Sequence, residues 1–172
     1  MYRFDTERRN MRKSLDAISL GALALMFWEC WRALYGPYHL PDRIPTHFDF
    51  AGNPDGWDSP SFLLTLTVVP ASIYLLMTLL TQFPSTFNYP VEVTYENRPR
   101  LEALTLDLIA WLKMEMVCLF AWVQWTIIEM ARRGRGDLSF LALLPVFLAA
   151  IFGTVAWYVV AMRRAAHTGS GS

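Results

Sequence analysis

The chain has 172 residues, of which 54% are hydrophobic and only 17% are charged. Its 15 Lys and Arg residues balance its 15 Asp and Glu residues, so the net charge gives no reason to expect nucleic acid as a partner. Two stretches, 62–83 and 138–162, contain no charged side chain. A helix rises about 1.5 Å per residue and the hydrocarbon core of a membrane is about 30 Å thick, so each stretch is long enough to cross it. These lengths exclude a soluble globular fold.

Two further apolar stretches, 15–35 and 104–130, are also long enough to cross a membrane, although both contain charged side chains. In lipid, only a helix or a closed barrel satisfies every backbone polar group, and the long apolar runs lack the alternation of barrel strands. The sequence therefore predicts an all-α integral membrane protein. Its four-helix bundle has spans at about 15–35, 62–83, 104–130 and 138–162.

The remaining residues are assigned around these spans. We expect residues 1–14 to form an N-terminal tail, residues 36–61 an outer loop between the first two helices, and residues 168–172 a flexible tail. Residues 15–167 then make up the transmembrane domain.

The positions of the cationic residues predict the orientation. With both termini in the cytoplasm, nine Lys and Arg residues lie on the inner side and four on the outer side. Inner loops carry the excess of Lys and Arg in membrane proteins, so cytoplasmic N- and C-termini are favoured. Arg132, Arg133 and Arg135 are among the four outer cations and oppose this orientation.

The predicted outer loop is too long for a simple connection and is expected to be structured. Apolar and polar residues alternate through it, so an extended chain places His47 and Asp49 on one face. The sequence Asn53-Pro54-Asp55-Gly56 predicts a tight turn, because Pro fixes φ at the second position and Gly closes the turn. Trp57 is expected at the membrane interface, where amphipathic rings settle.

His47, Asp49 and Asp55 allow two interpretations. Imidazole and carboxylate suit several divalent cations, so the three side chains are weak candidates for a metal site. Alternatively, His47 and Asp49 make hydrogen bonds within the loop and Asp55 is a turn former. The second interpretation is favoured because the three ligands would have to converge. No cofactor is evident from the sequence.

The stretch LPDRIPTHFDFAGNPDGWDSP resembles the signature of domain of unknown function 1648, in which IP-x-HF is followed by G-x-PDGW. The later segment NYPVEVTYENRPRLEALTLDLIAWLK is similar to the second half of stand-alone members. The resemblance implies an SdpI-like protein of the bacterial inner membrane, a family whose best-known member is an immunity protein against a secreted toxin. The chain has fewer predicted spans than SdpI itself, and the family motif implies no particular activity.

The third predicted span is unusual because it contains charged residues. At 100° per residue, Asp107, Glu115 and Glu129 fall in one sector together with several Trp residues. Lys113 lies in another sector and is expected to extend its ammonium group to the inner interface. Glu115 lies about 16 Å from the start of the span, near the middle of the bilayer. An ionised acid there costs about 2.5–3.5 kcal/mol, so Glu115 should face protein or water, or be protonated.

No cation is well placed to pair with Glu115, so hydroxyl groups are its expected partners, with Thr67, Ser72 and Thr154 as candidates. Two roles compete: a neutral acid that pins two helices together, or a functional group that serves either in a proton or substrate relay or in a contact to another subunit that supplies the missing partner. Arg32 is expected to pair with Glu29, three residues before it, or with Glu129.

These observations support two functional hypotheses. The first is a small membrane protein without catalysis that presents its outer loop to a peptide ligand. Its contact candidates are His47, Asp49, Asp55, Trp57, Arg32 and Glu29. The second is an accessory subunit within a larger membrane complex, which the Trp-rich face and the unpaired Glu115 motivate. An enzyme is not expected, because no set of catalytic residues converges. Expected partners are the lipid bilayer and a peptide or other membrane subunits.

Overall fold

The computed structural model describes residues 2–36, 40–49, 53–133 and 139–167. These residues form long helices and one small sheet. In chain order the elements are α1 (Tyr2–Tyr35), β1 (Ile44–Phe48), β2 (Pro54–Asp58), α2 (Phe62–Leu80), the short 3-10 helix η1 (Pro84–Thr86), α3 (Arg98–Arg133) and α4 (Ser139–His167). Arg135 and the predicted flexible tail, 168–172, lie outside the described residues.

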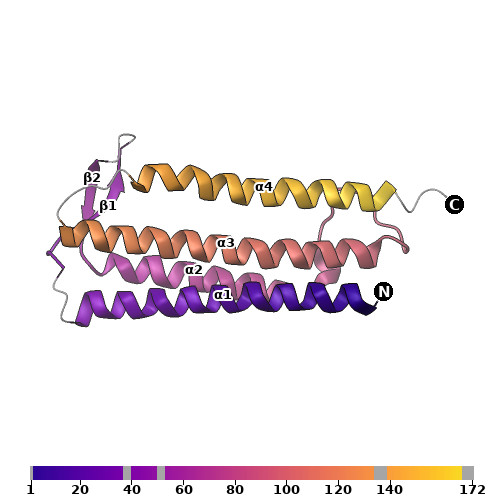
Figure 1. Cartoon of the computed structure of the whole chain (residues 1–172), viewed down its shortest axis with the longest axis horizontal. Helices are drawn as coiled ribbons and strands as arrows, with labels where there is room; N and C mark the ends of the chain where they lie inside the picture. The colour runs from indigo at the N-terminus through magenta and orange to yellow at the C-terminus, as the bar shows by residue number, and fades with distance from the viewer. Residues whose placement is uncertain (1, 37–39, 50–52, 134–138, 168–172) are drawn as a thin grey trace.

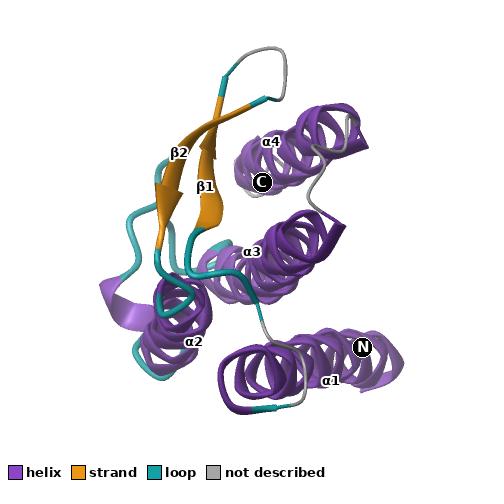
Figure 2. Ribbon diagram, turned by 90° about the vertical axis from the view of Figure 1, so that its left-hand side faces the viewer, coloured by secondary structure: helices purple, strands orange, loops and turns teal. Residues whose placement is uncertain are grey.

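The four helices lie side by side along the long axis of the molecule (Figure 1). The start of α1 and the end of α4 are at the same end of this bundle, and the β1–β2 hairpin is at the opposite end (Figure 1). Figure 2 shows α3 in the middle, between α1, α2 and α4. Accordingly, α3 packs against each of the other three helices.

Three of the helices are long and apolar enough to cross a membrane, over Asp5–Tyr35, Phe62–Leu80 and Leu143–Ala166. Many large apolar side chains on these helices point away from the bundle, including Leu75 and Phe152. So many exposed large apolar side chains are expected on a surface that lipid covers. The central helix α3 is not among the three, because charged and amide side chains interrupt its apolar sequence.

The all-α prediction is wrong in the outer loop, where β1 and β2 form an antiparallel pair. The turn predicted at Asn53-Pro54-Asp55-Gly56 is also wrong, because β2 begins at Pro54. Instead, Asp49 and Asn53 close the hairpin: the Asp49 N–H donates to the Asn53 carbonyl (2.9 Å), and the Asp49 carboxylate accepts the Asn53 N–H (2.8 Å). Asp stabilises such a reversal through this local bond, and Pro is tolerated at the first residue of an edge strand.

The helices differ from the predicted spans mainly at their ends. α1 begins at Tyr2, so the polar residues 5–14 continue the helix beyond the apolar span. Arg, Lys and Glu are good helix formers, so this extension has no intrinsic cost. α3 likewise extends beyond 104–130 at both ends, whereas α2 stops at Leu80, shortly before Pro84.

The buried apolar side chains form three clusters along the bundle. One lies at the hairpin end and joins α1, α2, α3 and β1 through Cys30, Leu63, Ile127 and Ile44. The second, in the middle, contains Leu23, Met26 and Val117. The third joins the start of α3 to the end of α4 through Leu101, Leu104, Met162 and Ala165.

Candidate functional site

The hairpin brings two of the predicted loop residues together. His47 lies on β1 and Asp55 on β2, and the imidazole Nδ1 is 2.5 Å from a carboxylate oxygen of Asp55. Gly56 faces His47 across the pair of strands, and a Cβ at position 56 would lie 2.7 Å from the His47 Cβ. Glycine is therefore favoured there, because a side chain at position 56 would meet the His47 Cβ, which is fixed to its backbone.

Asp49 does not join this pair. Its carboxylate is engaged by the N–H and the side-chain amide of Asn53, at 2.8 and 3.2 Å. Within the described ranges there is no group of three or more His, Cys, Asp or Glu side chains that could hold a metal ion. The structure thus brings His47 and Asp55 together, and in the described part of the loop Asp49 is engaged by Asn53 instead of joining them.

The outward side of the hairpin is open to solvent. The His47 side chain is 75% exposed and the Asp55 side chain 47% exposed, and Trp57 is also exposed. Arg43 donates a hydrogen bond to the Trp57 carbonyl (3.3 Å), which ties the base of β1 to β2. An imidazole, a carboxylate and an indole therefore lie close together on the same strands and are available to a ligand.

The other side of the hairpin is fixed to the bundle by Ile44. This side chain is completely buried and belongs to the cluster that contains Cys30, Leu63 and Ile127. Burying an isoleucine contributes about 1.5–3 kcal/mol. The hairpin is thus held against three helices by β1 while its polar residues remain exposed.

Glu29 and Arg32 lie on α1 near the hairpin end. Arg32 donates to Glu29 at 3.0 Å, which confirms one of the two predicted partners. Glu129 instead pairs with Arg132 and Arg133, at 3.5 and 2.5 Å. The cavity between these groups has a volume of only about 10 Å³, about the minimum that a single water needs. The two sets of ion pairs thus flank a very small cavity, and the structure places Glu29 and Arg32 beside α3 and not on the open face of the hairpin.

At the opposite end, Asp107 of α3 binds two arginines of α1. The Arg8 Nη1 is 2.6 Å from one carboxylate oxygen of Asp107, and the Arg12 Nε is 2.5 Å from the other. Arg12 also donates to the Ala103 carbonyl, at 3.3 Å. Asp107 is buried, so the two guanidinium groups compensate a carboxylate that would otherwise be costly.

Lys113, which was predicted to extend its ammonium group to the inner interface, makes its contacts with α1 and α2. Its side chain is 4% exposed and its Nζ is 2.7 Å from Asp16 of α1. The same ammonium donates to the Thr78 hydroxyl (3.1 Å) and lies 4.8 Å from the centre of the Tyr74 ring. A carboxylate, a hydroxyl and an aromatic face thus replace water around the cation.

Glu115 is buried between α3 and α4. The Thr154 hydroxyl donates to its Oε1 at 2.6 Å, which confirms one of the three predicted partners, whereas Oε2 has no hydrogen-bond partner among the described residues. Thr154 and the nearby Trp111 and Trp157 line a cavity of about 320 Å³. The carboxyl group therefore adjoins an aromatic cavity that lies between the two helices.

Gln124 was not recognised as a site residue, yet it joins three helices. It is buried on α3, accepts a hydrogen bond from Thr67 of α2 (2.8 Å) and donates to the Met26 carbonyl of α1 (2.8 Å). Thr67, a predicted partner of Glu115, is therefore used elsewhere. The amide can do this because it has both donor and acceptor atoms.

The contacts of α1 with α3 were also missed, although the sequence contains a signal for them. Arg8, Arg12 and Asp16 recur every four residues and continue into the apolar stripe of α1 that begins at Leu15. On a helix this spacing places all of them on one face. The signal was overlooked because residues 1–14 were assigned to a tail.

Comparison with known families gives one match. The family model of the Domain of unknown function (DUF1648) matches residues 30–70, from the end of α1 through the hairpin into α2. Comparisons with curated proteins and with solved structures give no match. The matched region contains His47, Asp55, Gly56 and Trp57, which are the residues that shape the open face of the hairpin.

Proposed function

We propose that this chain is a multi-pass protein of the bacterial inner membrane that presents the β1–β2 hairpin on the outer side to bind a cationic peptide. The observation that carries the proposal is the combination of a fixed and an open side in one hairpin. Ile44 is completely buried against the bundle, while His47, Asp55 and Trp57 stay exposed. A binding surface held in this way loses little conformational entropy when a ligand binds.

All four helices cross the membrane in this proposal, with α3 as the internal helix. Its polar side chains support this role because they have partners on neighbouring helices: Asp107 on α1, Lys113 on α1 and α2, and Glu115 on α4. Polar residues within transmembrane helices normally face the interior of the bundle and are paired in this way. The 36 residues of α3 span about 54 Å, more than the hydrocarbon core requires.

The arrangement of the ends supports cytoplasmic termini. The start of α1 and the end of α4 lie together (Figure 1), and these two segments contain Arg8, Arg9, Arg12, Arg163 and Arg164. Such a concentration of cations belongs on the inner side. The hairpin, at the opposite end, then faces outward.

The charge of the hairpin region indicates the class of peptide. Residues 40–58 contain four Asp and one Arg, a net charge of −3 with neutral His. Figure 2 shows β2 farther from α3 than β1, and Asp55, Trp57 and Asp58 of β2 are exposed. These two features support the addition of a strand at the outer edge of β2. A cationic peptide that pairs with this edge would be attracted by the acidic side chains, and the indole of Trp57 would contact its apolar residues. The resemblance to SdpI-like immunity proteins agrees with a secreted peptide as ligand.

Two measurements test the proposal. First, Asp58→Cys and Tyr95→Cys are made in a chain that lacks Cys30 and Cys118, and intact cells are treated with a membrane-impermeant maleimide. Labelling at position 58 and not at 95 is expected, and the reverse pattern contradicts the topology. Second, the protein in lipid nanodiscs is titrated with a short Lys-rich peptide and a Glu-rich peptide of equal length. Asp55→Asn should weaken binding of the Lys-rich peptide, whereas Glu96→Gln, at the other end of the bundle, should not; equal binding of both peptides contradicts the proposal.

A second function, an accessory subunit of a larger membrane complex, is favoured by one observation. The Oε2 atom of Glu115 is buried without a partner among the described residues, and such an atom is normally satisfied. A neighbouring subunit could supply the missing donor through the cavity lined by Trp111 and Thr154. Purification in a mild detergent decides between the two: a stable heteromeric complex that Glu115→Ala disrupts supports the subunit, and a free small protein supports the binding protein.

A further inference from the structure

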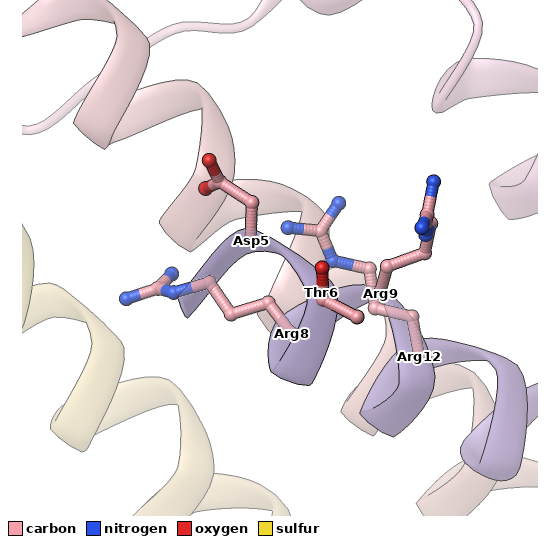
Figure 3. Close-up of a pocket in the computed structure, with 5 residues that line it drawn as sticks. All are labelled: Asp5, Thr6, Arg8, Arg9 and Arg12. Carbon is pink, nitrogen blue, oxygen red and sulfur yellow. The ribbon is translucent and has the colours of Figure 1, made fainter. Parts of the chain in front are cut away.

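We propose that the arginine-lined cavity at the start of α1 binds the phosphodiester of an anionic membrane lipid. The cavity has a volume of about 360 Å³ and is lined by Asp5, Thr6, Arg8, Arg9 and Arg12. Figure 3 shows the three arginine side chains fanning out from one stretch of α1, with Arg8 on one side, Arg9 on the other and Arg12 between them. This site is at the end of the bundle opposite to the hairpin (Figure 1).

Two of the three guanidinium groups are held in place before any ligand arrives. Arg8 and Arg12 each bind one oxygen of the buried Asp107, at 2.6 and 2.5 Å. A guanidinium has five N–H donors. The hydrogen bonds to Asp107 and Ala103 use one donor of Arg8 and two of Arg12, so both groups retain donors for an anion. Preorganised arginines of this kind suit phosphate, which they bind through paired hydrogen bonds.

Arg9 supplies a charge that Asp107 does not compensate. Its side chain is exposed, and it has no ion pair or hydrogen bond with any residue in the described part of the chain. The three arginines contribute +3, and Asp5 with Asp107 contributes −2, so the site has a net charge of +1. That balance matches one phosphodiester, which carries a single negative charge.

The position of the cavity relative to the apolar part of α1 indicates that a lipid supplies the phosphate. The apolar part of α1 begins at Leu15, and at about 1.5 Å per residue Arg12 lies about 5 Å and Arg8 about 10 Å before it. Asp107, which binds both guanidinium groups, lies about 5 Å inside the apolar part of α3, which begins at Leu104. The arginines therefore lie at the level of the lipid headgroups, where each cation near an anionic surface adds about fivefold to binding.

The experiment uses native mass spectrometry of the full chain in detergent, titrated with phosphatidylglycerol, phosphatidylcholine or inorganic phosphate. We expect phosphatidylglycerol to bind at least about fivefold more tightly than phosphatidylcholine, and inorganic phosphate at millimolar concentration not to displace it. Arg9→Gln should weaken phosphatidylglycerol about fivefold. Arg163→Gln is the matched control, because Arg163 is also exposed and lies on α4 near the same end.

Asp5→Asn provides a second variant that acts in the opposite direction. It removes a negative charge from the lining of the cavity and should strengthen phosphatidylglycerol binding about fivefold. Equal affinity for the two lipids, or equal losses in Arg9→Gln and Arg163→Gln, overturns the proposal. Displacement of the lipid by inorganic phosphate indicates a site for free phosphate and overturns the assignment to a lipid. These results do not depend on the hairpin, so they leave the test of peptide binding separate.

Discussion

The ammonium group of Lys113 lies 2.7 Å from the carboxylate of Asp16, and this contact joins α3 to α1 inside the bundle. Lys113 is almost completely buried, whereas Asp16 is 38% exposed on its side chain. The buried ammonium group of Lys113 is shielded from water, so contacts with Asp16, Thr78 and the Tyr74 ring must compensate for its lost hydration.

Asp16→Ala is expected to destabilise the folded protein more than an ordinary surface substitution. Loss of one partner of a buried pair costs about 3–5 kcal/mol, and the partial exposure of Asp16 places the expected value at the lower end. The double variant Asp16→Ala, Lys113→Met should recover most of this loss, since no buried charge remains. Unfolding of all variants in a denaturing detergent measures the difference, and a double variant as unstable as Asp16→Ala alone would contradict this interpretation.

Gly56→Ala is expected to disrupt the hairpin without unfolding the helices. The added Cβ would lie 2.7 Å from the Cβ of His47, which cannot rotate away. Overpacking of this kind costs about 1–3 kcal/mol. Hydrogen exchange of the β1 and β2 amides should become faster, while exchange in α3 stays unchanged.

Gly21→Ala is the matched control for that experiment. Gly21 lies in α1, and a Cβ there meets no atom within 4 Å. Alanine favours a helix over glycine by about 1 kcal/mol, so this variant should be as stable as the wild type or slightly more stable. Similar exchange in both variants would mean that the close approach of Gly56 to His47 does not shape the hairpin.

The sequence was sufficient to predict the helices that are marked by long, uninterrupted apolar stretches. Phe62–Leu80 and Ser139–His167 coincide closely with stretches that contain no charge, because length and hydropathy alone define such helices. The extension of α1 to Tyr2 could not be predicted from hydropathy, because it depends on Arg8 and Arg12 binding a carboxylate on another helix.

The hairpin was predicted only in part for a related reason. Alternation correctly indicated an extended segment around His47, but local turn propensity favoured a turn at Pro54, where the structure has the start of β2. The observed hairpin depends on two contacts. The helices bury Ile44 of β1, and Asp49 closes the hairpin through its hydrogen bonds with Asn53. Packing against distant residues overrode the local signal.

Glu115→Gln is expected to leave stability unchanged within about 0.5 kcal/mol if the acid is a neutral pin, because the amide oxygen can still accept from Thr154. Thr154→Val should cost about 1–2 kcal/mol, since it removes the donor that lies 2.6 Å from Oε1. Detergent unfolding measures both variants. Loss of folding or of subunit assembly in Glu115→Gln would show that the ionised acid is required.

Tyr89, in the connection between α2 and α3, provides a test that depends on pH. Its hydroxyl is buried without a hydrogen-bond partner among the described residues. Burial raises the pKa of the Tyr89 phenol, the negative charge of Glu102 raises it further, and Arg98 and Thr105 act in the opposite direction. The folded protein therefore holds this proton more tightly than the unfolded chain does.

A group whose pKa is raised in the folded state contributes fully to the free energy of unfolding below its pKa in the unfolded chain, which is about 10 for Tyr. This contribution is lost as the pH rises from that value through the pKa of the folded state. The wild type should accordingly lose stability on the alkaline side of pH 10. Tyr89→Phe should lose less over the same range, and at neutral pH it should be as stable as the wild type or about 1 kcal/mol more stable, because a buried hydroxyl without a partner is removed. The two proteins are compared by detergent unfolding between neutral and alkaline pH. Parallel curves for the two would mean that the Tyr89 phenol ionises equally easily in the folded and unfolded states.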